Sequence, residues 1–96
     1  MPLFIMTINW TDQGVKSVKD SPKRLDAARK LAETVGARLG DFYMTMGACD
    51  MVVHLDAPDD ATVAKFVLLQ AGGGNVRTQT LKAFSEDEYR KILGAL

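Results

Sequence analysis

The sequence predicts an α+β fold with the element order βαββαβ, followed by a terminal helix. Four apolar segments show the two-residue alternation that is typical of strands, and helical apolar spacing separates most of them. The second and third apolar segments follow each other directly, as in a hairpin. With 96 residues, of which 47% are hydrophobic, the chain has the size of one domain, expected over residues 1–96.

The first part of the chain predicts a strand, a short turn and a helix. Residues Leu3 to Asn9 are apolar on both faces, which indicates a central strand. A capped turn is expected from Thr11 to about Asp20. Ser21 followed by proline then starts a helix, because proline is tolerated at the first helical position, and Gly36 ends it. Its apolar stripe is Leu25, Ala28, Leu31, Ala32 and Val35.

The middle of the chain predicts two strands, Arg38 to Met46 and Cys49 to Asp56, with a tight turn at Gly47 and Ala48. Simple alternation assigns the side chains of these strands to two faces. In the second strand, Leu39, Asp41, Tyr43 and Thr45 are expected to oppose Gly40, Phe42, Met44 and Met46. In the third strand, Met51, Val53 and Leu55 are expected to oppose Val52 and His54.

The last part predicts a helix, a strand and a second helix. Pro58 ends the third strand, and Asp59 or Asp60 caps the helix that follows. Glycines 72 to 74 close that helix and precede the fourth strand, Val76 to Ala83. Because these glycines lie between a helix and a strand, they do not match a phosphate-binding loop. A capping-box spacing at Ser85 starts a terminal helix with the stripe Tyr89, Ile92, Leu93 and Leu96.

This element order predicts a four-stranded antiparallel sheet with the strand order 4-1-3-2. Two crossover helices can cover only one face of such a sheet. The first strand nevertheless carries Ile5 on one face and Phe4 and Met6 on the other. An uncovered second face would expose an apolar patch of several hundred Å², the size that marks an interaction surface. We therefore expect a homodimer, or a higher homo-oligomer, with two sheets packed face to face.

The composition excludes several classes of protein. Twelve basic residues balance twelve acidic ones without forming a cluster, so a nucleic-acid partner is not expected. No apolar run has the length of a membrane span, and the N-terminal residues lack the features of a secretory signal, which predicts a cytoplasmic protein. Cys49 is the single cysteine, so we expect no intrachain disulfide bond, and neither a metal nor a cofactor.

Several stretches of the sequence resemble the GYD-domain family. They are NWTDQGVKSVKDSPKRLDAARKL, FYMTMG, DMVV, APDDATVAKF and GNVRTQTLKAFSEDEY, and together they cover almost the whole chain. The resemblance implies a ferredoxin-like domain of the dimeric α+β barrel superfamily, from a bacterium or archaeon. The stretch closest to the family's Gly-Tyr-Asp tract is Gly47 to Asp50, in which Cys49 precedes the aspartate. The wider superfamily includes cofactor-independent monooxygenases, haem-degrading enzymes and ligand-binding regulators, so the fold alone selects no function.

Four side chains are candidates for contact with a ligand: Trp10, Tyr43, His54 and Arg77. Each also has a purely structural interpretation. The two aromatic residues can belong to the core, the histidine can be packed and hydrogen-bonded, and the arginine can be solvated on an edge strand. No convergent pair of ionisable groups is evident. The leading hypothesis is therefore a homodimer that is at most weakly catalytic and holds a small apolar ligand between sheet and helices.

Two other classes of function remain open. A cofactor-independent monooxygenase or isomerase would use His54 as its base, with Tyr43 or Trp10 orienting an aromatic substrate. That hypothesis requires His54 to face a solvent-connected pocket, within hydrogen-bond reach of another polar side chain. A structural oligomerisation module would instead show a further apolar surface outside the dimer contact. Cys49 is interpreted as a buried small hydrophobic residue, and Asp50 as a cap of the turn between strands.

Overall fold

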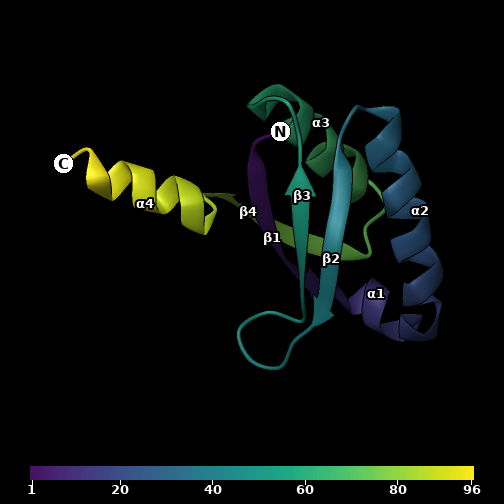
Figure 1. Ribbon diagram of the computed structural model, residues 1–96. Coiled ribbons are helices and arrows are strands. Elements are labelled where there is room, and N and C mark those ends of the chain that lie inside the picture. Colours follow the sequence, from purple (N-terminus) through teal and green to yellow (C-terminus); the bar gives the residue numbers. More distant parts are fainter.

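The computed structural model describes residues 1–96 and contains one four-stranded sheet with helices on one face (Figure 1). The sheet has the order β2-β3-β1-β4 with every neighbouring pair antiparallel, which confirms the predicted α+β fold and strand order. The elements are β1 (Leu3–Trp10), α1 (Asp12–Lys16), the 3-10 turn η1 (Val18–Asp20), α2 (Ser21–Thr34), β2 (Arg38–Met44), β3 (Met51–Asp56), α3 (Asp60–Ala71), β4 (Val76–Ala83) and α4 (Glu86–Gly94).

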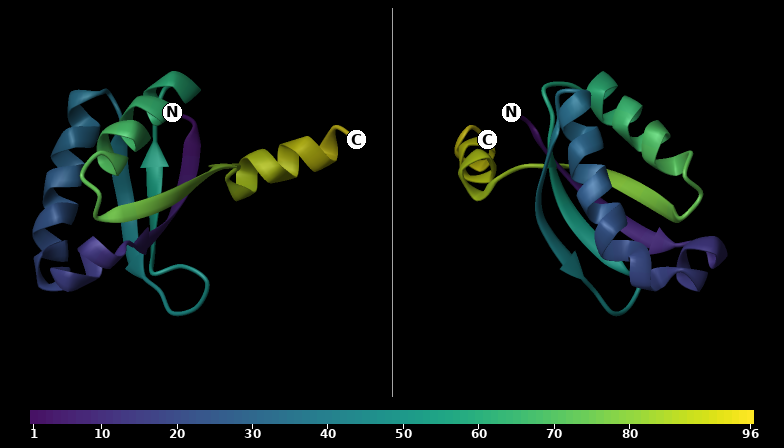
Figure 2. Two further views of the ribbon diagram at one scale, coloured as in Figure 1. Left: turned by 180° about the vertical axis from the view of Figure 1, so that it is seen from behind. Right: turned by 90° about the vertical axis from the view of Figure 1, so that its right-hand side faces the viewer.

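The core lies between the sheet and the two crossover helices, α2 and α3 (Figure 2). The central strands β1 and β3 send alternate side chains into it, as predicted. The helices meet them with small residues from α2, which let that helix approach the sheet closely, and with Phe66 of α3, which is almost fully buried. The largest buried side chains are Met6, Val53, Leu55 and Phe66.

Strand β2 departs from the simple alternation that the sequence predicts. Its pairing with β3 shifts between Leu39 and Phe42, and both of these side chains pack on the helix side of the sheet. The prediction that they lie on opposite faces is wrong, because an irregularity of this kind inserts unpaired residues and changes the parity of the strand. Arg29 of α2 holds the shifted segment, since its Nη1 donates to the carbonyl oxygens of Leu39 at 2.9 Å and Gly40 at 3.1 Å.

The connection between β2 and β3 is longer than the predicted two-residue turn. Strand β2 ends at Met44, and residues 45–50 form a loop closed by a bond from the Thr45 N–H to the Asp50 carbonyl oxygen at 2.8 Å. The Thr45 hydroxyl also donates to the Cys49 carbonyl oxygen at 2.6 Å. Cys49 is only half-buried in this loop, so its interpretation as a buried core residue is wrong.

The loop after α3 is tied to the segment after β1, which keeps β4 in place at the sheet edge. Thr11 makes two of these hydrogen bonds. Its backbone N–H donates to the Asn75 carbonyl oxygen at 3.0 Å, and its hydroxyl donates to the Gly74 carbonyl oxygen at 2.6 Å. Gly14 of α1 lies so close to this loop that a Cβ atom added there would overlap the backbone oxygen of Asn75.

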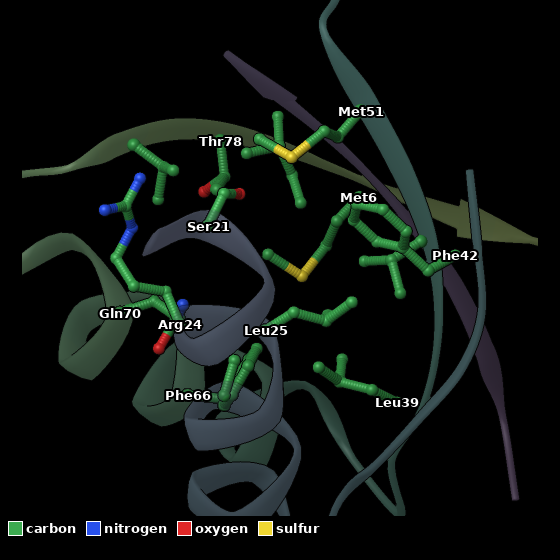
Figure 3. A pocket seen from close by; sticks show the side chains of 14 residues that line it. Met6, Ser21, Arg24, Leu25, Leu39, Phe42, Met51, Phe66, Gln70 and Thr78 are labelled. Carbon is green, nitrogen blue, oxygen red and sulfur yellow. The ribbon is translucent and has the colours of Figure 1, made fainter. Parts of the chain in front are cut away.

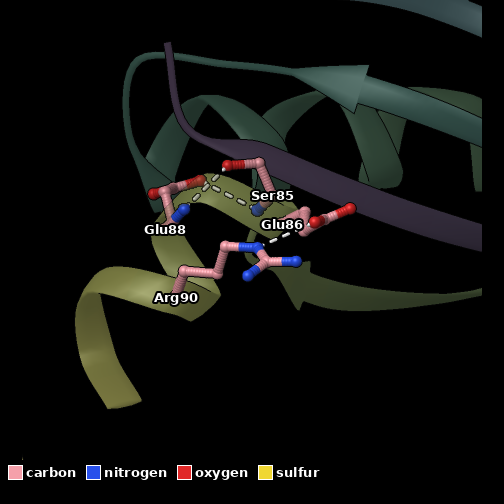
Figure 4. Close-up of polar contacts among 4 residues, drawn as sticks. All are labelled: Ser85, Glu86, Glu88 and Arg90. Atoms are coloured by element: carbon pink, nitrogen blue, oxygen red, sulfur yellow. Dashed lines mark hydrogen bonds and ion pairs between the residues drawn. The ribbon is translucent and has the colours of Figure 1, made fainter. Parts of the chain in front are cut away.

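The terminal helix α4 extends away from the rest of the molecule (Figure 1). Its start is defined by the predicted capping box, in which the Ser85 hydroxyl accepts from the Glu88 N–H and the Glu88 carboxylate accepts from the Ser85 N–H (Figure 4). Glu86 and Arg90 form an exposed ion pair one turn apart, with 2.8 Å between Nε and Oε2. The predicted apolar stripe is present, but its members Tyr89, Ile92, Leu93 and Leu96 are all exposed.

We predict that Gly14→Ala lowers the free energy of unfolding by about 1–3 kcal/mol, because the added methyl group forces α1 away from the Asn75 carbonyl. Urea unfolding followed by circular dichroism measures this change. Gly94→Ala is the matched control, because a Cβ atom at Gly94 meets nothing within 4 Å and alanine favours the helix. Equal unfolding midpoints for the Gly14→Ala variant and the wild type would contradict the close approach.

Candidate functional site

One face of the sheet is covered by no helix of the chain, and we call it the open face (Figure 2). Its members follow from the strand register, because directly paired residues in an antiparallel sheet point to the same side. The apolar members are half-buried along β1 and β3 and exposed on the edge strands. The open face consists of Leu3, Ile5, Thr7, Asn9, Arg38, Tyr43, Val52, His54, Asp56, Arg77, Gln79, Leu81 and Ala83.

His54 lies on the open face, paired with Ile5 of β1 and beside Tyr43 of β2. The two rings meet edge to face, with their centroids 6.3 Å apart and an interplanar angle of 64°. No side-chain hydrogen bond involves the His54 imidazole, and His54 lines neither of the two main pockets. The enzymatic hypothesis required a pocket and a polar partner for this base, and within one chain His54 has neither.

Trp10 lies on the other side of the sheet, in an apolar groove between the N-terminal part of α2 and the neighbouring ends of β1, β2 and β3. The groove has a volume of about 300 Å³ and is open to solvent at Met44, whose side chain is 71% exposed. Methionine adapts its shape readily, so this lip can adjust to different occupants. The lining residues are Trp10, Val18, Ser21, Pro22, Leu25, Phe42, Met44 and Met51.

A smaller cavity of about 60 Å³ continues from the groove towards α3 (Figure 3). The two share Ser21, Leu25, Phe42 and Met51 as lining residues, so they are contiguous. The cavity alone is below the ~150 Å³ that holds a benzene ring in an engineered core, and it has room for only a few waters. An apolar ligand larger than that therefore has to occupy the open groove.

The four side chains predicted to bind a ligand do not form one site. Trp10 lines the groove, whereas Tyr43 and His54 are neighbours on the open face. Arg77 also lies on the open face, but near one end of the edge strand β4, where it pairs with Asn9 and forms no ion pair. The sheet itself separates the groove from the open face, so the structure offers two distinct surfaces.

Asp50 connects the loop of residues 45–50 to the end of β1. Its Oδ2 accepts a hydrogen bond from the Trp10 backbone N–H at 3.0 Å. Its own N–H donates to the Ile8 carbonyl oxygen at 3.0 Å and to Asn9 Oδ1 at 2.9 Å. The carboxylate thus caps the end of β1 rather than its own turn, which the Asp50 backbone carbonyl closes, and it holds the backbone of Trp10 at the rim of the groove.

Sequence reasoning did not identify the role of Arg24, which lines the cavity and holds the segment before α2. Its Nη1 donates to the Ser17 carbonyl oxygen at 3.0 Å, and its Nη2 donates to that of Gly14 at 3.2 Å. The only signal in the sequence is a basic residue in the first turn of a helix, and that pattern is too common to indicate such a contact.

The ionisable groups with shifted pKa values lie at helix N-termini. A hydrogen bond from the Thr62 backbone N–H lowers the pKa of Asp59, and one from the Ser85 backbone N–H lowers the pKa of Glu88. Nowhere do three or more histidine, cysteine, aspartate or glutamate side chains come close enough to hold a metal ion. No helix combines the length and the apolar character that a membrane crossing requires.

A family model described as GYD domain matches residues 4–93. The chain belongs to the GYD-domain family. The resemblance seen in the sequence is thereby confirmed, and the match includes the loop of residues 45–50. In this GYD domain that region closes a hairpin and ties it to β1.

A curated relative from Thermus thermophilus is 36% identical to this chain over 84 residues, which are 86% of this chain and 88% of the relative. It is named "Glutamine synthetase and cystathionine beta-lyase binding protein". Two crystal structures share the fold. MtbAldR has a TM-score of 0.68 and 16% identity, and TTHA0845 from Thermus thermophilus has a TM-score of 0.55 and 20% identity. Each comparison covers 88% of this chain, together with 52% of MtbAldR and 95% of TTHA0845, so the chain spans about half the length of MtbAldR.

Proposed function

We propose that this GYD domain is a non-catalytic, homodimeric binding protein whose partners are metabolic enzymes. The observation that carries the proposal is the open face, a sheet surface with a row of apolar side chains and no cover within the chain. Ile5, Val52 and Leu81 are its apolar centre, and Leu81 is 55% exposed. A β-sheet with an uncovered apolar face gains free energy by stacking on a second sheet.

The chemistry of the two surfaces favours binding over catalysis. The groove is lined almost entirely by apolar side chains, and the histidine lies on the opposite face of the sheet. General acid–base catalysis needs an ionisable group within hydrogen-bond reach of the reacting atoms. Neither surface brings such a group together with a pocket, so a cofactor-independent oxygenase or isomerase is the weaker hypothesis.

The relative from Thermus thermophilus supports enzymes as partners, because its name describes binding to glutamine synthetase and cystathionine β-lyase. This chain also exposes apolar side chains outside the open face, which leaves them free for a partner when two sheets are stacked. Met46 is 93% exposed in the loop, and Leu68 is 73% exposed on α3. Both side chains remain accessible to an enzyme partner when two open faces are stacked.

A small apolar ligand in the groove is the second candidate function. The groove has the volume of a small-molecule site and a mainly apolar lining, with Trp10 on one side and α2 on the other. A ligand there would contact the start of α2 as well as Met44 and Met51, which flank the loop of residues 45–50. It would thus lie close to the loop side chains that we assign to partner binding.

We predict that the wild-type chain sediments at micromolar concentration with twice its 10.5 kDa mass. Leu81→Glu should raise the dimer dissociation constant at least tenfold, because the two-fold symmetry buries two unpaired carboxylates per dimer. Analytical ultracentrifugation measures both values. Leu68→Glu, the same apolar-to-acidic change at an exposed leucine of α3, is the matched control and should leave the dimer intact. A monomeric wild-type protein would rule out the stacked sheets.

We predict that the chain binds purified glutamine synthetase, cystathionine β-lyase, or both, taken from the organism that encodes it. Titration calorimetry measures the affinity, which we expect in the micromolar range that is typical of transient protein contacts. Met46→Asp should weaken binding about tenfold if the loop takes part, without changing the dimer. Failure of both enzymes to bind at 100 μM would refute these partners for this chain.

We predict that the groove binds 8-anilinonaphthalene-1-sulfonate, an apolar aromatic probe, and that binding quenches the fluorescence of Trp10, the chain's single tryptophan. Leu25→Phe adds bulk inside the groove and should weaken this quenching about tenfold. Leu69→Phe on α3, outside the groove, is the control. Equal quenching curves for the two variants would show that the probe binds elsewhere.

A further inference from the structure

No other element of the chain packs extensively against the apolar stripe of the terminal helix α4. It has nine residues, fewer than the ~12–15 that an isolated helix needs to be even marginally stable in water. Its capping box and its Glu86–Arg90 pair favour the helix, but each contributes only a fraction of what packing supplies. Tyr89, Ile92 and Leu93 are about half-exposed, and no other element packs extensively against them. The stripe therefore requires an apolar surface outside its own chain.

The hinge that leads into α4 is held in a defined direction. The Lys82 ammonium lies 5.3 Å from the centroid of the Phe4 ring and 4.9 Å from that of the Phe84 ring. It also donates to the carbonyl oxygens of Leu3, at 3.4 Å, and Ala83, at 3.0 Å. Two residues, Phe84 and Ser85, separate β4 from α4, so these contacts fix the direction in which the helix leaves the sheet.

That direction places α4 on the side of the sheet opposite α2 and α3. In both views of Figure 2 the sheet lies between these two helices and α4, so α4 stands out from the side of the open face. A second sheet stacked on that face would lie about 10 Å away, beside the projecting helix. The helix is thus positioned to contact a second copy rather than the sheet of its own chain.

We propose that α4 is an arm that packs its apolar stripe, Tyr89, Ile92, Leu93 and Leu96, on the second copy of the chain in the dimer. This inference rests on the proposed stacking of open faces. Because a two-fold dimer repeats every contact, each copy extends one arm and receives the other. The two α4 helices then pack against the stacked sheets, each on the other copy of the chain.

The area that a stable dimer buries supports this assignment. A face of four strands spaced ~4.8 Å apart and about eight residues long covers only ~500 Å². A stable interface buries about 800 Å² on each partner. An arm of nine residues is ~14 Å long and ~10 Å wide, so it covers ~140 Å² of the other copy. Giving one arm and receiving another brings each copy close to the area that a stable dimer requires.

The test replaces two members of the stripe and measures the dimer dissociation constant by analytical ultracentrifugation. The Ile92→Asp, Leu93→Asp double variant should raise this constant 10- to 100-fold, while at high concentration it still forms a dimer through the sheet faces. The matched control changes the polar side of the same helix, Asp87→Asn with Lys91→Gln, and should leave the constant within threefold of the wild type.

Hydrogen exchange of the wild-type protein gives a second readout that does not depend on a variant. The amides of Tyr89 to Gly94 should be protected at protein concentrations above the dimer dissociation constant and exchange freely below it.

Three outcomes would contradict the proposal or its basis. An unchanged dissociation constant in the stripe variant, or exchange that is independent of concentration, overturns the arm while leaving the stacked dimer in place. A wild-type protein that is monomeric at all concentrations refutes the dimer itself. Protection that appears only when glutamine synthetase or cystathionine β-lyase is added also overturns the proposal, because the stripe then belongs to the enzyme contact.

Discussion

The architecture depends on one constraint: two crossover helices of 14 and 12 residues can cover only one face of a four-stranded sheet. The covered face holds every large buried side chain, including Met6, Leu55 and Phe66. The other face carries Ile5, Val52 and Leu81, apolar residues for which the monomer offers no partner. The hydrophobic effect that builds the core therefore leaves these apolar side chains without cover in the monomer, and this is the basis of the proposed dimer.

The same sheet separates the two surfaces to which the candidate functions are assigned, the open face and the groove. Neighbouring residues of a strand point to opposite faces, so the parity of one position decides which surface a side chain serves. Phe42 faces the groove together with Trp10, whereas Tyr43, the next residue, lies beside His54 on the open face. A catalytic site that combines Trp10 with His54 would have to reach through the sheet. Recognition at two separate surfaces is the arrangement that this geometry permits.

The sequence predicted the parts of the fold that follow from local periodicity. The alternation in β1 and β3, the caps at Asp59 and Ser85, and the strand order are confirmed. The errors arose where a distant contact overrides local pattern. The irregularity in β2 is held by Arg29 of α2, and no pattern within residues 38–44 reveals that contact. The loop of residues 45–50 is likewise set by Asp50 bonding to β1, so its length and the half-buried position of Cys49 could not be read from the hairpin alone. The four candidate ligand residues were predicted individually, and their separation by the sheet follows from the register that pairs His54 with Ile5 and Arg77 with Asn9, whereas Trp10 points to the other face.

Several polar side chains of this domain hold its backbone. Arg24 and Arg29 donate to carbonyl oxygens, Asp50 accepts from the Trp10 N–H, and Lys82 fixes the hinge before α4. Hydrogen bonds that satisfy backbone groups stabilise a shape. That shape presents apolar side chains at the centre of the open face, in the groove and along the stripe of α4, although the open face also carries polar residues such as His54 and Arg77. Each of these three surfaces gains free energy mainly by leaving water, and this favours the proposed binding function over catalysis.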